Sequence, residues 1–193
     1  MEASPPLWFR LPPGYQPFDP ASLTPVRAHA PEWVGPLDEI FRCGTFYAAL
    51  GLHWTDVNEV VTTSLFTLSA IRTSVRDPAV AAARALVSRA RWPHWTAETS
   101  ELRTIARATP AAFTAGVLRC GDVDAVSVSQ AAYSFLVPGA ASLATAALTT
   151  PDLAQAEAYA EILGAVADTI SFEEPASTPA PRQPLSRISE LLT

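Results

Sequence analysis

Six runs of apolar and β-branched residues, separated by short turn clusters, constrain the fold of this chain more than any other feature. They cover residues 45–54, 59–71, 100–108, 111–120, 127–137 and 142–150. Runs of Val, Ile, Thr and aromatic residues between turns predict β-strands. In the run 59–71, Phe66 faces one side and Leu65 the other, so both faces are apolar. This run is therefore expected to be a central strand of a sheet that is covered on both sides.

Two other segments repeat their apolar residues at helical spacing. The first starts at Asp77 and Pro78, an N-cap followed by a proline in the first turn. Its apolar stripe consists of Val80, Ala83, Val87 and Ala90. The second is expected to start at Thr150 as N-cap and Pro151 as first residue. Its stripe consists of Leu153, Ala156, Ala160, Leu163, Ala167 and Ile170. The order of segments predicts an α+β fold, an antiparallel sheet of about six strands packed with two amphipathic helices.

The distribution of proline divides the chain into three regions. Residues 1–36 are rich in proline, which disfavours a central strand or long helix, yet they carry Trp8, Phe9 and Tyr15. We expect this arm to pack on the domain surface. Residues 37–174 form the α+β domain. Residues 175–193 are predicted to be a Pro-rich linker followed by a short amphipathic peptide.

Composition and charge restrict the class of protein. All thirteen basic residues are arginine, and with 18 prolines this indicates a GC-rich bacterial genome. The net charge is −6, and aromatic and basic residues do not alternate, which argues against nucleic-acid binding. No run approaches the roughly 18 apolar residues of a membrane span, and the first ten residues do not resemble a secretory signal. We therefore expect a cytoplasmic protein.

The residues that usually carry catalysis or bind metals are few and scattered. His29, His53 and His94 show no metal-ligand spacing, and neither do Cys43 and Cys120. No nucleophile motif or phosphate-binding loop is present. The sequence therefore predicts no metal, no cofactor and no catalytic residue, which favours a protein that is not an enzyme.

The candidate partner-binding residues lie in and after the first helical segment. Trp92 and Trp95 flank a proline and a histidine, where they are expected either to stack on a partner or to close the helix end against the sheet. Arg84 and Arg91 belong to residues 61–107, where seven arginines against three acidic residues leave a net charge of +4. This basic face either docks an acidic partner, balances the acidic second helix, or faces water.

The C-terminal peptide is the other candidate. Its apolar residues fall on one face of two helical turns, and they are Leu185, Ile188, Leu191 and Leu192. Such a peptide beyond a Pro-rich spacer docks either on its own domain or in the groove of another protein. The leading hypothesis is thus a non-catalytic adaptor, chaperone or accessory subunit, associated with secretion or assembly, whose partner is another protein and which can form a homo-oligomer.

Two alternative functions remain open. One is a small-molecule-binding protein or enzyme with a pocket between sheet and helix, to which Tyr47, His53 and Tyr133 would contribute polar groups. The other is an immunity or structural subunit that buries a larger flat surface.

The C-terminal half resembles the PsbP-like family. The resemblance rests on "YSFLVPGAASLATAALTTPD", which leads into "AYAEILGAVADTISF" and ends near Phe172, and on the early "LPPGY". It covers residues 7 to 174. Its relatives include a photosystem accessory subunit, a Ran-binding import factor and the Eag chaperones of type VI secretion. The resemblance implies an α+β sandwich used as a binding scaffold, and it carries over no catalytic residue.

Overall fold

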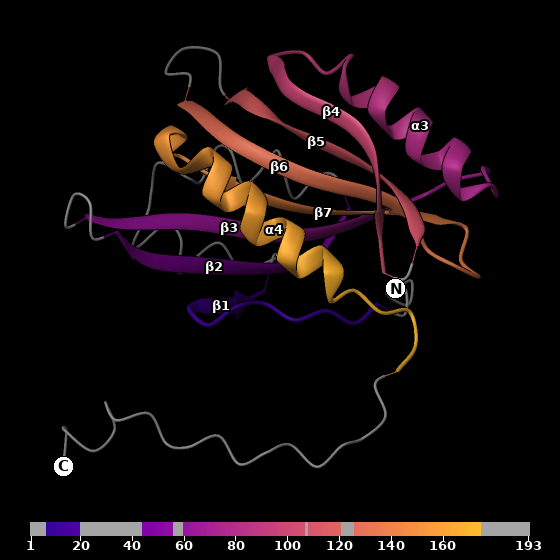
Figure 1. Cartoon of the computed structure of the whole chain (residues 1–193), viewed down its shortest axis with the longest axis horizontal. Helices are drawn as coiled ribbons and strands as arrows, with labels where there is room; N and C mark the ends of the chain where they lie inside the picture. The colour runs from indigo at the N-terminus through magenta and orange to yellow at the C-terminus, as the bar shows by residue number, and fades with distance from the viewer. Residues whose placement is uncertain (1–6, 20–43, 56–59, 107, 121–125, 175–193) are drawn as a thin grey trace.

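The protein folds around one seven-stranded antiparallel sheet in the strand order β1-β2-β3-β7-β6-β5-β4 (Figure 1). The computed structural model describes residues 7–19, 44–55, 60–106, 108–120 and 126–174. The strands are β1 (Tyr15–Phe18), β2 (Thr45–Thr55), β3 (Val60–Arg72), β4 (Trp95–Ile105), β5 (Thr109–Cys120), β6 (Val126–Leu136) and β7 (Ser142–Thr150). The predicted α+β class is confirmed, with β3 in the interior of the sheet.

The sheet has one strand more than the predicted six. The additional strand, β1, lies in the Pro-rich arm and pairs with β2, so that Tyr15 is opposite Gly51. Prolines in this arm argue against a central strand, but β1 is an edge strand, where a missing backbone donor such as that of Pro17 is tolerated. The arm also reaches the end of the chain's second main helix, because Trp8 forms a β-bridge with Ser171.

The two main helices, α3 (Pro78–Arg89) and α4 (Ala156–Asp168), lie on opposite faces of the sheet. Successive residues of a strand point to opposite faces. On β6, Gln130 accepts a hydrogen bond from Arg89 of α3. Tyr133, an odd number of residues further on, packs in the core cluster that contains Leu163 of α4. Gln130 and Tyr133 therefore point to opposite faces of the sheet, and so α3 and α4 lie on opposite sides of it.

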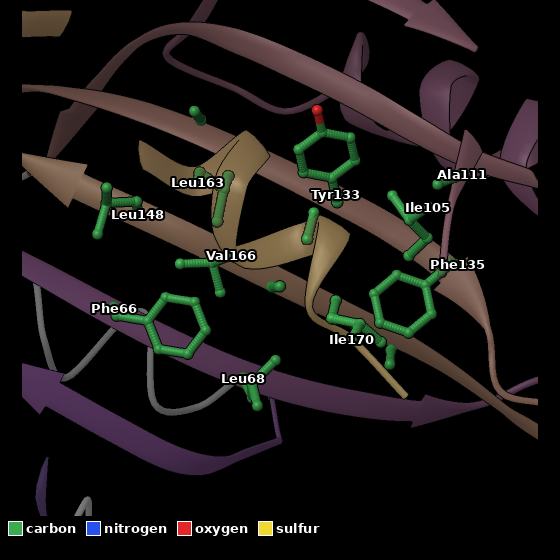
Figure 2. Packing of buried hydrophobic residues seen from close by; sticks show 14 of the residues in the cluster. Phe66, Leu68, Ile105, Ala111, Tyr133, Phe135, Leu148, Leu163, Val166 and Ile170 are labelled. Atoms are coloured by element: carbon green, nitrogen blue, oxygen red, sulfur yellow. The ribbon is translucent and has the colours of Figure 1, made fainter. Parts of the chain in front are cut away.

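The main core lies between α4 and the sheet (Figure 2). Phe66 of β3 and Phe135 of β6 are almost completely buried there, and Leu163 and Val166 of α4 pack among them. Burial of each large apolar side chain contributes about 1.5–3 kcal/mol. A smaller cluster on the other face contains Leu65 and Val128. The two apolar faces predicted for residues 59–71 are thus confirmed around Leu65 and Phe66.

The helix that begins at Asp77 forms as expected, but its buried face differs from the prediction. The Asp77 side chain accepts hydrogen bonds from Ala79 and Val80 backbone N–H groups. Ala81 and Ala82 face the sheet and are buried, whereas Val80 and Val87 are exposed. The predicted inward stripe is therefore wrong. The alanines allow close approach to the sheet, and the spacing of the valines alone does not reveal which face is buried.

The start of the second helix also differs from the prediction. Thr150 is the last residue of β7, and its hydroxyl donates to the Thr63 carbonyl and accepts from the Asp152 N–H. Asp152 caps a short 3-10 helix, η2 (Leu153–Gln155), which leads into α4. The sequence corner at Thr150 and Pro151 is thus a strand end and a turn. No helix within the described residues is long and apolar enough to cross a membrane.

Candidate protein-binding surface

The tryptophans that follow α3 are both held by one arginine. The guanidinium carbon of Arg89 lies 4.1 Å from the ring centroid of Trp92 and 3.9 Å from that of Trp95. Cation–π contacts of this kind each contribute about 0.5–2 kcal/mol, depending on desolvation. The Arg89 side chain therefore holds both rings at the junction of α3 and β4.

Arg89 is itself anchored to the interior of the sheet. Its Nη2 donates to the Gln130 side-chain oxygen, and Gln130 Nε2 donates to Thr149 Oγ1 at 2.9 Å. Gln130 and Thr149 are both buried. Because a planar guanidinium bonded to a buried amide has little rotational freedom, this chain of contacts fixes the position of the Trp92 ring.

The turn between the two tryptophans is also constrained. His94 has a φ of 63°, in the left-handed region that non-glycine residues seldom adopt. Its carbonyl accepts a hydrogen bond from the Arg119 N–H at 3.0 Å, which ties the turn to β5. Such a conformation costs of order 1–3 kcal/mol and persists only where neighbouring contacts enforce it.

Trp92 remains accessible although it is held in place. It is 43% exposed, whereas Trp95 is half-buried at the start of β4. β4 is an edge of the sheet, and its Leu102 is 57% exposed. Thus Trp95 closes the helix end against the sheet, and Trp92 presents an apolar ring to solvent. Of the two uses proposed from the sequence, closing the helix end describes Trp95, and stacking on a partner stays a prediction for Trp92.

The basic face is exposed but does not balance the acidic second helix. Arg84 and Arg91 are exposed, and in the part of the chain that the structure describes no carboxylate lies within ion-pair distance of either. The sheet lies between α3 and α4, so the acidic residues of α4 face away from these arginines. The described contacts leave both guanidinium groups available at the surface.

The residues proposed for a pocket lie on the α4 face of the sheet but in different surroundings. Tyr47 lies opposite Leu68, and Leu68 lies opposite Ala146. Ala146 in turn lies opposite Tyr133. Three strand spacings, about 14 Å, therefore separate the backbones of Tyr47 and Tyr133.

Each of these tyrosines has its own partners. Tyr47 packs edge-on against Phe9 of the arm, with ring centroids 5.0 Å apart, and burial raises its pKa. The Tyr133 hydroxyl accepts a hydrogen bond from Arg103 at 3.0 Å. Arg103 also lies over the Phe113 ring at 3.8 Å. The two tyrosines therefore do not converge on one site.

His53 belongs to a polar cluster between the arm, the sheet and α4. Its Nε2 lies 3.2 Å from Ser64 Oγ, which lies 2.9 Å from the Tyr15 hydroxyl. Burial lowers the pKa of His53, and burial raises the pKa of Tyr15 to about 12 despite the hydrogen bond to Ser64. Nearby, the Tyr159 hydroxyl lies 2.9 Å from Thr62 Oγ1.

The pair His53–Ser64 has the spacing of a base and a nucleophile, but Ser64 is completely buried. A hydroxyl that solvent does not reach is not available to attack a substrate. The cluster is a buried polar network whose groups bond to one another. Within the described residues, no group of three or more His, Cys, Asp or Glu side chains is placed to hold a metal ion.

One proposed binding site from the sequence lies outside the described residues, the C-terminal peptide with Leu185, Ile188, Leu191 and Leu192. His29 and Cys43 also lie outside them, while Cys120 is buried in β5. The domain boundaries at residues 36 and 174 stay predictions.

Sequence reasoning missed the residues that organise the tryptophan surface. Arg89 falls among charged residues of an amphipathic helix, and Gln130 falls in a strand whose other residues are apolar, tyrosine or serine. The sequence did contain one signal, the glutamine at position 130 of a predicted strand. A side-chain amide that is buried in a central strand requires a polar partner. Which partner it finds depends on the packing of α3 across β6.

Comparisons with known proteins define the fold and no more. No family model matches the chain, and no curated protein matches it in sequence. Among solved structures, it is similar to the crystal structure of LpqN, involved in cell envelope biogenesis of Mycobacterium tuberculosis. The TM-score is 0.53 at 12% sequence identity, over 87% of this chain and 83% of LpqN. At this identity the similarity establishes a shared α+β fold.

Proposed function

We propose that this protein is a non-catalytic adaptor or accessory subunit that binds another protein through the surface around Trp92. The observation that carries the proposal is a tryptophan that is 43% exposed while its ring rests on an arginine anchored to a buried glutamine. Interface hot spots are enriched in Trp and Arg. A ring already held in place loses little conformational entropy on binding, which favours affinity.

The surroundings of Trp92 support a protein partner. The exposed side chain of Arg91 adds a positive charge in the turn that carries Trp92, and Leu102, seven residues beyond Trp95, adds exposed apolar area further along the β4 edge. Interfaces of this kind combine an aromatic anchor with a polar rim. The polar groups proposed for a small-molecule pocket bond instead to neighbouring residues, so no observation favours that alternative.

The fold is compatible with a scaffold of the PsbP-like type, and we include that relationship in the proposal. The relatives named by the resemblance act as accessory subunits, adaptors and chaperones. LpqN is involved in cell envelope biogenesis, which is a property of LpqN. For this chain we propose an association with secretion or assembly and a cytoplasmic location, which fractionation of the native host tests.

The experiment compares Trp92→Ala with Leu153→Ala, because Leu153 is exposed to a similar degree (46%) at the start of the α4 segment. Tagged full-length proteins are cross-linked and purified from the native host, and the captured partner is then produced and titrated calorimetrically. We expect Trp92→Ala to weaken binding about 30-fold, the effect of a hot spot worth 2 kcal/mol, and Leu153→Ala to bind normally. Equal affinity of the two variants contradicts the proposal.

The C-terminal peptide is tested separately with a protein that ends at Glu174. If this protein no longer binds the partner while Trp92→Ala binds normally, the binding site is the C-terminal peptide. Retention of the partner leaves the Trp92 surface as the site.

A further inference from the structure

The outward face of α3 is apolar and basic. Helical residues advance by 100° each, so Val80, Arg84 and Val87 lie within about 60° of one another. All three are exposed, Val80 at 44% and Val87 at 54%. The valines are seven residues apart, which is about 10.5 Å at 1.5 Å per residue, whereas Arg91 follows the C-cap Ala90 in the turn beyond α3.

The outward face of α4 has the same repeat with the opposite charge. Ala158 and Ala165 are exposed and seven residues apart. Glu161 and Asp168 are also exposed and seven residues apart. Neither carboxylate forms an ion pair with another of the described residues, where Arg103 and Glu101 are the residues that do. The face therefore presents small apolar side chains with carboxylates beside them.

These two faces do not meet within one molecule. α3 contacts β4, β5 and β6 on one side of the sheet, and α4 contacts β6 and β7 on the other. The helices are thus separated by two layer spacings, on the order of 20 Å. This exceeds the Debye length of about 8 Å at physiological salt, so their charges hardly stabilise each other inside the molecule.

We propose that the outward face of α3 in one copy packs against the outward face of α4 in a second copy. Val80 and Val87 would pack against Ala158 and Ala165, whose small side chains permit close approach of the two helix axes. Arg84 would face Glu161 and Asp168, as flanking charges do in paired helices.

The position of the helices determines the kind of assembly. Because α3 and α4 lie on opposite faces of the sheet, each copy uses a different surface for each neighbour. Such a contact is heterologous and leaves one free α3 and one free α4 at the ends, so that the assembly grows head to tail. One helix pair buries less than the roughly 1,200 Å² of a stable interface, so the association is weak and depends on concentration.

This inference does not depend on the proposed function. Trp92 follows the helix, and its ring rests on Arg89, which lies on the inward side of α3. Loss of self-association would leave partner binding by Trp92 intact, and loss of partner binding would leave self-association intact.

The test is an exchange of charges, measured by sedimentation velocity over a wide range of protein concentration. One variant is Arg84→Glu, which leaves Arg91 next to Trp92 unchanged, and the other is Glu161→Arg with Asp168→Arg. Each variant alone should associate about tenfold or more weakly than the wild type, because like charges then face each other. An equimolar mixture of the two should associate again, because every contact between the variants pairs opposite charges.

A control variant, Arg119→Glu, lowers the net charge by the same amount as Arg84→Glu, at an exposed position outside both helix faces. It should retain the wild-type association. A wild type that stays monomeric at every concentration overturns the proposal. So does a mixture that stays monomeric while the wild type associates, or a closed dimer that grows no further.

Discussion

At the scale of single residues, Gly51 shows how little space the polar cluster leaves. A Cβ atom at this position would lie 2.6 Å from His53 Nε2, 2.7 Å from Ser64 Oγ and 2.7 Å from Tyr15 Cε1. All three atoms belong to side chains of the Tyr15–Ser64–His53 network, which closes over the glycine. The absence of a side chain at residue 51 is therefore what allows the arm to bond to β3.

We expect Gly51→Ala to destabilise the protein by about 1–3 kcal/mol, because overpacking forces Tyr15 or His53 out of its position. Urea unfolding followed by circular dichroism measures the change. Gly164→Ala is the matched control, since its Cβ would meet only the Tyr133 hydroxyl at 3.8 Å and the residue is inside α4. That variant should be neutral or more stable by about 0.5–1 kcal/mol. Similar losses in both variants would contradict the steric argument.

At the scale of elements, the two helices differ in how their first turns are capped. The Asp77 carboxylate accepts two N–H groups of α3, from Ala79 at 2.8 Å and Val80 at 3.0 Å. Asp152 accepts one N–H, from Ala154 at 3.2 Å, and that bond belongs to η2 rather than to α4. Since α3 has few large buried side chains of its own, it relies more on its cap than α4 does.

Asp77→Ala should therefore cost about 1–2 kcal/mol of unfolding free energy, and Asp152→Ala about 0.5 kcal/mol. Hydrogen exchange localises the effect: amides of α3 should lose protection in Asp77→Ala, while those of α4 should keep it. If Asp152→Ala proves as costly as Asp77→Ala, the cap of α3 is not the stronger one.

At the scale of the whole molecule, the N-terminal arm connects separate parts of the fold. It pairs with β2 through β1, bridges Ser171 through Trp8, and bonds to β3 through the Tyr15 hydroxyl. The pKa of Tyr15 is raised to about 12, mainly by burial. In the unfolded chain the phenol ionises near its ordinary value of 10.0, whereas the native state holds its proton to higher pH.

The contribution of Tyr15 to the free energy of unfolding should consequently be fully present below pH 10. It should fall as the pH rises towards 12, because the unfolded state then binds fewer protons than the native state. The shift corresponds to about 2–3 kcal/mol. Tyr47, whose pKa is also raised, changes stability in the same direction. Urea unfolding at a series of alkaline pH values measures the slope. Tyr15→Phe should give a shallower slope, and an unchanged slope would show that another group controls alkaline unfolding.

Several features of this protein could be derived from its residues alone. The six strand segments, the helix that starts at Asp77 and the interior position of residues 59–71 follow from local propensity and from apolar residues on both faces of a run. These signals are local, since a strand pattern or a cap involves neighbours within a few residues. Likewise, the tryptophan pair could be singled out, because large aromatic side chains contribute strongly both to cores and to interfaces.

Only the tertiary structure decided which face of α3 is buried. Val80 and Val87 have helical spacing but are exposed, whereas Ala81 and Ala82 are buried, because their small side chains let the helix approach the sheet closely. The pairing of Arg89 with Gln130 joins residues 41 positions apart, and Tyr15 meets Ser64 across 49 positions. Contacts at such separations arise from strand order and helix placement, because these bring together side chains that no local pattern relates.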